Sequence, residues 1–320
     1  MYLIASAQGP VSQRLTEALL SEGQPLRLLS FSSETTSRWS ALRADVQSGD
    51  LEDSTVWEQA LEAVQAVVLV SSPFDHEQGF AGRDDAFFPA FTEGYDRQFG
   101  HLPADEQPSV ILLSSLWAGV QGQEGEPEDW SDQLCQAEIL LRNSCPNLVV
   151  LRSALLVESW KTALPMAKDH SILPGFLPLE LAAPWVSIRD VAELLGEALL
   201  QREKGQHVVH LHGGESKNAE DLCAALGDVM TKRMMPIVVP QSDHSSVLQQ
   251  QGHDSRSAAL WTGFYRKVMA CPEPLPEEGV LPVEAKTALP DALFELFKAY
   301  RSEQNRKKDP GRELYDPDMV

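Results

Sequence analysis

Basic charge and long apolar runs are both scarce in this chain. Lysine and arginine number 26 against 47 aspartate and glutamate, which gives a formal net charge of −21 at pH 7. Nucleic acids and anionic membranes attract basic patches, so this deficit argues against either as a direct partner. No stretch reaches the roughly 18 apolar residues of a transmembrane helix. The N-terminus also lacks the basic start of a signal peptide, so we expect an acidic, cytoplasmic protein.

Metal-binding and disulfide patterns are missing as well. The four cysteines are widely spaced and never form a C-x-x-C pair, so we expect free thiols. Three histidines fall within residues 207–212, where the period of a strand places only His210 and His212 on one face. No third ligand is evident in the sequence, so we predict that the protein holds no metal.

Glycine is scarce where a dinucleotide-binding turn would need it. Residues 1–5 form an apolar strand, and residues 13–20 have the pattern of an amphipathic helix. The turn between them lies where the G-x-x-G-x-x-G fingerprint would lie. The glycines of that fingerprint allow a tight turn, close approach of pyrophosphate and close helix packing. Only Gly9 remains, because serines hold the outer positions, 6 and 12. The candidate cofactor-binding residues of this turn are Ser6, Gln8, Gly9, Pro10 and Val11.

Short apolar runs, by contrast, recur through the first half of the chain. Four of them are Leu3–Ala5, Ala66–Val70, Val110–Leu113 and Leu148–Leu151, and helix-like segments lie between them. This alternation predicts an α/β fold with a doubly wound sheet, in which the four runs are neighbouring parallel strands. The second half differs: Pro165, Pro174, Pro178 and Pro184 break up one segment, and helical patterns follow from residue 187 onward.

Small polar residues follow several of the predicted strands. The carboxyl ends of parallel strands meet at one edge of the sheet, where ligands of open α/β sheets bind. Such residues also simply end strands, but their position favours the lining of a cleft. His76, between Asp75 and Glu77, is a weak candidate for a general base near this edge. The further candidate binding residues are Phe31, Ser32, Asp50, Leu51, Ser71, Ser72, Ser114 and Ser115.

In order and spacing these segments resemble the NmrA-like family, an atypical branch of the short-chain dehydrogenase/reductase fold. The segments that carry the resemblance are Leu3–Leu20, Gly49–Leu51, Val68–Pro73, Leu112–Ser115, Ala137–Arg142, Leu148–Arg152 and Trp185–Ala192. The resemblance implies a Rossmann-type domain over residues 1–155, to which 186–214 return. It also implies a helical lobe from 156–185 and 215–304, with NAD(P) and a small molecule bound in the cleft between the two parts. We expect residues 305–320 to be a mobile tail.

The departures from the family pattern concern the chemistry. Reductases of this fold carry a Tyr and, four residues later, a Lys; alignment on Glu138 puts Trp130 and Leu134 at these positions. Neither side chain performs acid–base chemistry. The second strand ends in Phe31 rather than in the acidic residue that would bind a ribose hydroxyl, although Arg38 is near enough in sequence to reach a 2′-phosphate. The resemblance places four tryptophans around the cleft, namely Trp117, Trp130, Trp160 and Trp185.

The resemblance to the family and the departures from its pattern lead to three functional hypotheses. The first is a small-molecule-binding protein of regulatory or non-classical function. The second is an NAD(P)H-dependent oxidoreductase of the atypical type, in which the cofactor carries the chemistry and the protein orients it. The third is a non-redox enzyme that reuses the interdomain cleft. The resemblance implies NAD(P), whereas the degenerate glycine turn predicts weak binding. The sequence leaves a protein partner or a homodimer open.

Overall fold

The centre of the molecule is a single parallel sheet. The computed structural model describes residues 1–5, 9–30, 39–40, 42–70, 84–122, 127–275 and 278–308. In the sheet the strands follow the order β12-β10-β6-β5-β4-β1-β2-β3. Their bounds are β1 Tyr2–Ala5, β2 Leu26–Ser30, β3 Asp45–Ser48, β4 Ala66–Val70, β5 Ser109–Ser115, β6 Leu148–Ser153, β10 Gln206–His212 and β12 Leu281–Glu284.

The four apolar runs form the middle of this sheet, as the sequence predicts. They are β6, β5, β4 and β1, which are consecutive neighbours, and every pairing between them is parallel. In the register Ile4 lies beside Val68, and Val68 lies beside Ile111. All five side chains of β4 are buried, because helices cover the sheet on both sides. Burial on both faces is the reason that these strands are continuously apolar instead of alternating.

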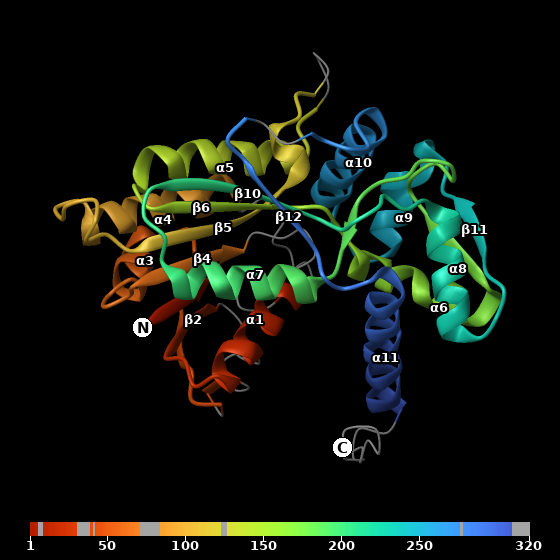
Figure 1. Ribbon diagram of the computed structural model, residues 1–320, viewed down its shortest axis with the longest axis horizontal. Helices are drawn as coiled ribbons and strands as arrows, with labels where there is room; N and C mark the ends of the chain where they lie inside the picture. The colour runs from red at the N-terminus through yellow and green to blue at the C-terminus, as the bar shows by residue number, and fades with distance from the viewer. Residues whose placement is uncertain are drawn as a thin grey trace.

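Two helical layers enclose the sheet (Figure 1). Helices α1 (Pro10–Ser21) and α7 (Ile188–Gln201) cover one face, and their buried residues form a core with that face. The opposite layer consists of α3 (Ser54–Ala60), α4 (Asp84–Phe99) and α5 (Trp130–Ser144). Gly94 lets α3 and α4 touch, since a Cβ there would lie 2.7 Å from the carbonyl oxygen of Ser54. The α/β, doubly wound fold class predicted from the sequence is therefore confirmed.

A second, smaller core lies beyond the carboxyl edge of the sheet, at the right of Figure 1. It is formed by the 3₁₀ helix η3 (Val157–Ala163), α6 (Leu164–His170), β8 (Ile172–Gly175), α8 (Ala219–Met230) and α11 (Leu289–Lys308). β8 pairs with β11 (Met235–Val238) as a small separate sheet. The remaining elements are η2 (Leu116–Gly119), β7 (Leu155–Leu156), β9 (Trp185–Val186), η4 (Gln241–Asp243), α9 (His244–Gln250) and α10 (Ser255–Ala270).

One strand of the segment 215–304 belongs to the main sheet and not to the lobe. β12 pairs in parallel with β10 and forms the outer strand on that side, with Val209 beside Leu281. The chain thus crosses from the lobe to the sheet once more before α11. In the described part of the chain, no helix is long and apolar enough to cross a membrane.

Candidate functional site

The candidate site lies at the carboxyl edge of the parallel sheet, which faces the lobe in Figure 1. Of the residues predicted from the sequence, Gly9 follows β1, Asp50 and Leu51 follow β3, and Ser114 and Ser115 end β5. The parallel order of the strands brings these ends to the same edge. The other predicted residues lie outside the described part of the chain: Ser6, Gln8, Phe31, Ser32, Arg38, Ser71, Ser72 and His76.

Helix α1 begins at this edge without a side-chain cap. Gly9 is its N-cap residue, in an extended conformation, and Pro10 follows at the first helical position. The first backbone bond of the helix runs from the Gln13 N–H to the Gly9 carbonyl oxygen, at 2.8 Å. The amides of Val11 and Ser12 precede that bond, and helix geometry leaves them to an acceptor from outside the helix. In contrast, α3, α5, α7, α8 and α10 each have a side-chain cap.

Ser12 adds an unused polar group to this helix terminus. Its side chain is completely buried, and no described residue makes a hydrogen bond with its Oγ. Its backbone carbonyl oxygen, by contrast, accepts from the Thr16 hydroxyl at 2.7 Å. A buried hydroxyl without a partner is costly unless a ligand or water satisfies it. The start of α1 therefore offers backbone amides, the positive end of a helix dipole and one hydroxyl, a set that suits an anion.

The residues after β3 are used mainly for local structure. Asp50 is exposed, and its Oδ1 accepts from the Glu52 amide at 3.1 Å. Leu51 is buried in the core beneath α3, and its carbonyl oxygen accepts from the Trp57 indole at 2.8 Å. These bonds fix the turn between β3 and α3. A direct contact of either residue with a cofactor stays a prediction.

Ser114 belongs to a buried polar network at the end of β5. Its Oγ donates to Glu138 Oε1 at 2.6 Å. Arg152, at the end of β6, donates to the same carboxylate through Nε at 2.9 Å and through its terminal nitrogen at 2.7 Å. All three side chains are buried. The Glu138–Arg152 ion pair thus joins α5 to two strands of the sheet, and it occupies the Ser114 hydroxyl. Ser115 caps η2 by accepting from the Trp117 amide at 3.3 Å.

The first turns of α5 carry no proton-transferring side chain at the two positions where the resemblance places Tyr and Lys. Trp130 is 2% and Leu134 is 5% exposed, so both are part of the core. Trp117 is buried too, and its indole donates to the Cys271 carbonyl oxygen at 2.8 Å. Trp160 and Trp185 are half-buried and pack against each other, with ring centroids 5.6 Å apart.

A lysine that the sequence analysis did not single out lies at the start of α5. Lys267 of α10 is buried, and its Nζ contacts Asp129 Oδ2 at 3.0 Å, Asp132 Oδ1 at 2.6 Å and Ser131 Oγ at 2.9 Å. Three acceptors match the three donors of an ammonium group, so this lysine has no donor left for a ligand. One signal was present in the sequence: Lys267 follows Phe264 by three residues, on the apolar face of the helix.

A half-buried titratable group lies where the lobe meets the sheet. Glu158 of η3 accepts from the Ser187 hydroxyl at 2.9 Å and from the Ile188 amide at 3.0 Å, at the start of α7. Burial raises the pKa of this carboxyl group to about 7, although the two hydrogen bonds oppose the shift. The group is thus partly protonated near neutral pH, and it ties η3 to α7. The described residues hold no group of three or more His, Cys, Asp or Glu arranged for a metal ion.

Comparison with known proteins finds similarity in structure but not in sequence. No protein-family model matches the chain. No curated protein matches it significantly either. Solved structures, in contrast, match over almost their full length. A nucleoside-diphosphate-sugar epimerase from Staphylococcus aureus has a TM-score of 0.71 at 14% identity, covering 92% of this chain and 99% of that one.

Two reductases match equally well. An NADPH-dependent quinone oxidoreductase from Escherichia coli, in complex with NADPH, has a TM-score of 0.70 at 18% identity and covers 93% of this chain and 100% of its own. Triphenylmethane reductase from Citrobacter sp., in complex with NADP(H), has a TM-score of 0.71 at 13% identity. The match covers 92% of this chain and 100% of the reductase. These matches concern the fold alone: the chain has the Rossmann-type fold of these epimerase and reductase structures.

Proposed function

We propose that the protein binds an NADPH-type dinucleotide with its pyrophosphate at the start of α1, and that it acts as a binding or regulatory protein without reductase chemistry. The observation that carries the proposal is the uncapped start of α1. Gly9 supplies no cap, and the buried Oγ of Ser12 has no partner among the described residues. This terminus sits after β1, where dinucleotides bind in sheets of this topology. The NADPH and NADP(H) complexes of two proteins of similar fold support it.

The same turn also argues for weak binding. Pro10 has no amide hydrogen, so one of the donors that would face a phosphate is absent. Ser12 stands where a fingerprint glycine would allow the helix and the strand to pack more closely. We therefore expect a weaker complex than a full three-glycine turn would form.

The absence of reductase chemistry is argued from α5. A reduced nicotinamide, when bound, supplies a hydride, and a reductase of this fold adds a proton donor. Trp130 and Leu134 are buried apolar side chains at the positions of that donor and of the lysine that tunes it. General acid catalysis contributes roughly 10²–10⁴-fold in rate, so its loss leaves slow chemistry at best. The nearby Lys267 ammonium is already bonded to three acceptors.

An NAD(P)H-dependent oxidoreductase is the second candidate function. It is favoured by the fold shared with the quinone oxidoreductase and the triphenylmethane reductase. In that case the residues of this chain would orient the two reactants, and water would provide the proton. Turnover of a substrate distinguishes the two candidates.

Two substitutions at one position test the proposed binding site. Gly9→Asn adds a neutral side-chain cap to α1, and Gly9→Asp adds a charged one. Both should raise the free energy of unfolding by only about 0.2–0.5 kcal/mol, because glycine is itself a tolerated N-cap residue. NADPH affinity is measured by titration calorimetry. It should be at least tenfold lower in Gly9→Asp than in Gly9→Asn, because the carboxylate of Asp repels pyrophosphate. Asn218→Asp at the cap of α8 is the matched control and should leave the affinity unchanged. Equal NADPH affinities in the native, Gly9→Asn and Gly9→Asp proteins would contradict the proposal.

A further inference from the structure

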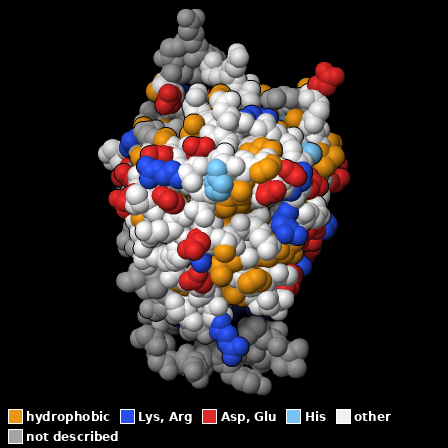
Figure 2. Space-filling view, turned by 90° about the vertical axis from the view of Figure 1, so that its left-hand side faces the viewer, with side chains coloured by type: hydrophobic (Ala, Val, Ile, Leu, Met, Phe, Trp, Pro, Cys, Tyr) orange, Lys and Arg blue, Asp and Glu red, His pale blue; other side chains and the backbone are white. Residues whose placement is uncertain are grey.

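A hollow of about 430 Å³ opens at the amino edge of the sheet, opposite the candidate dinucleotide site. The residue before β4, the loop before β5 and the turn between α7 and β10 form its walls. Strands of five and seven residues separate the two edges, a distance of about 15–20 Å. The lining residues used in the argument are Gln65, Asp105, Glu106, Gln107, Arg202 and Lys204. Figure 2 views this edge, where basic side chains stand among acidic ones.

Two cations on one wall are held by neutral oxygens. An Arg202 terminal nitrogen donates to Gln65 Oε1 at 3.0 Å, and Lys204 Nζ donates to the Gln107 carbonyl oxygen at 3.1 Å. In the described part of the chain neither cation has a carboxylate within ion-pair distance, although the protein has a net charge of −21. An arginine has five N–H donors and an ammonium group has three, so both keep donors for a ligand.

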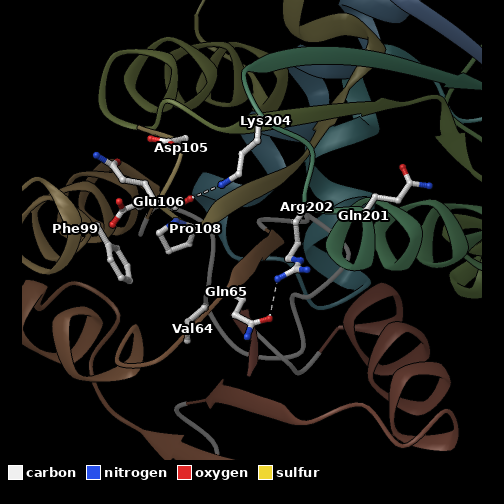
Figure 3. A pocket seen from close by; sticks show the side chains of 10 residues that line it. Val64, Gln65, Phe99, Asp105, Glu106, Pro108, Gln201, Arg202 and Lys204 are labelled. Atoms are coloured by element: carbon white, nitrogen blue, oxygen red, sulfur yellow. Dashed lines mark hydrogen bonds between the residues drawn. The ribbon is translucent and has the colours of Figure 1, made fainter. Parts of the chain in front are cut away.

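The loop before β5 adds negative charge to the same hollow. Asp105 and Glu106 are exposed in this loop, whose Gln107 carbonyl oxygen accepts from Lys204 (Figure 3). The space is far larger than one inorganic ion and lies within the range of small-molecule sites. A molecule with an anionic group and separate hydrogen-bond donors would contact both the cations and the carboxylates.

We propose that this hollow binds a small metabolite that carries a phosphate or carboxylate group toward Arg202 and Lys204, and hydroxyl or ammonium groups toward Asp105 and Glu106. Bidentate contacts from a guanidinium and a point contact from an ammonium suit either anion. The site is separate from the dinucleotide site and does not depend on it. It adds a second ligand to the protein.

Three probes of matched size test the site by titration calorimetry: glucose 6-phosphate, gluconate and glucose. We expect glucose 6-phosphate or gluconate to bind, which also identifies the preferred anion, and glucose to bind at least tenfold more weakly. Arg202→Asn, which tolerates the left-handed backbone at this position, and Lys204→Gln should each weaken the anionic probe about tenfold.

Two control variants separate this site from general charge and from the dinucleotide site. Lys286→Gln removes an exposed cation elsewhere, and Gly9→Asp alters the start of α1; both should bind the anionic probe as the native protein does. The proposal is overturned if neither anionic probe binds better than glucose. It is also overturned if Lys286→Gln or Gly9→Asp weakens binding as much as Lys204→Gln does. A failure of NADPH to bind would contradict the proposed function and leave this site intact.

Discussion

Lys267 Nζ lies 3.0 Å from Asp129 Oδ2, and this contact joins two helices that are 138 residues apart at these positions. Asp129 is also the N-cap of α5, where it accepts from the Ser131 amide at 2.7 Å. Gly263 allows the approach, since a Cβ there would lie 2.9 Å from Asp129 Cβ. The first turn of α5, to which the family resemblance assigns a catalytic position, is thus an anchor for α10 in this protein.

Lys267→Met tests that anchor. The substitution leaves Asp129 and Asp132 near a side chain that cannot neutralise them, and breaking a buried pair in this way costs about 3–5 kcal/mol. The free energy of unfolding, measured in urea, should fall by that amount. Lys286→Met, at an exposed pair with Glu193, is the control and should change it by less than about 1 kcal/mol. Similar losses in the two variants would show that Lys267 is no anchor.

Ser114 and Glu138 should differ strongly in their effect on stability. Ser114→Ala removes one hydrogen bond and keeps the bidentate contact of Arg152 with Glu138, so it should cost about 1 kcal/mol. Glu138→Leu leaves the Arg152 guanidinium buried without its carboxylate and should cost about 3–5 kcal/mol. Thermal and urea unfolding measure both. A loss for Glu138→Leu no greater than that for Ser114→Ala would contradict the structural role of the ion pair.

Glu158 predicts a pH dependence of stability. Its pKa is about 7 in the folded protein, above the ordinary value of 4.5. The folded state therefore binds more protons than the unfolded state between these values, and the contribution of this group to stability is lost as the pH rises from 4.5 to about 7. The loss is on the order of 1–3 kcal/mol. Glu158→Gln should flatten the curve of unfolding free energy against pH in this window. Parallel curves for the native and variant proteins would refute this assignment.

The sheet was predictable because its central strands are buried on both faces. Such strands are continuous apolar runs, as at Ala66–Val70, and these runs are visible in the sequence. The strands that the sequence analysis missed include β8, β11 and β12, and each contains a proline: Pro174, Pro236 and Pro282. A proline argues against a central strand, and these three strands lie in a two-stranded sheet or at the end of the main one.

The candidate site was predictable only where it is local in sequence. The turn at Gly9 is contiguous with β1 and α1, so its pattern is visible in a short window. Lys267 and Asp129 are 138 residues apart in the sequence, and no spacing rule connects the two. Ser114 looked like a cleft residue because it ends a strand, yet its hydroxyl is bonded to Glu138. A strand end gives the position of a side chain and not its partner.

The central claim is that the protein binds the dinucleotide without using it as a reductant, and one assay tests it most directly. NADPH is titrated into the native protein, and the absorbance of the reduced nicotinamide is then followed across a panel of quinones, aldehydes and ketones. The account predicts saturable binding, and oxidation no faster than in buffer. No saturable binding, or brisk turnover of any member of the panel, would contradict it.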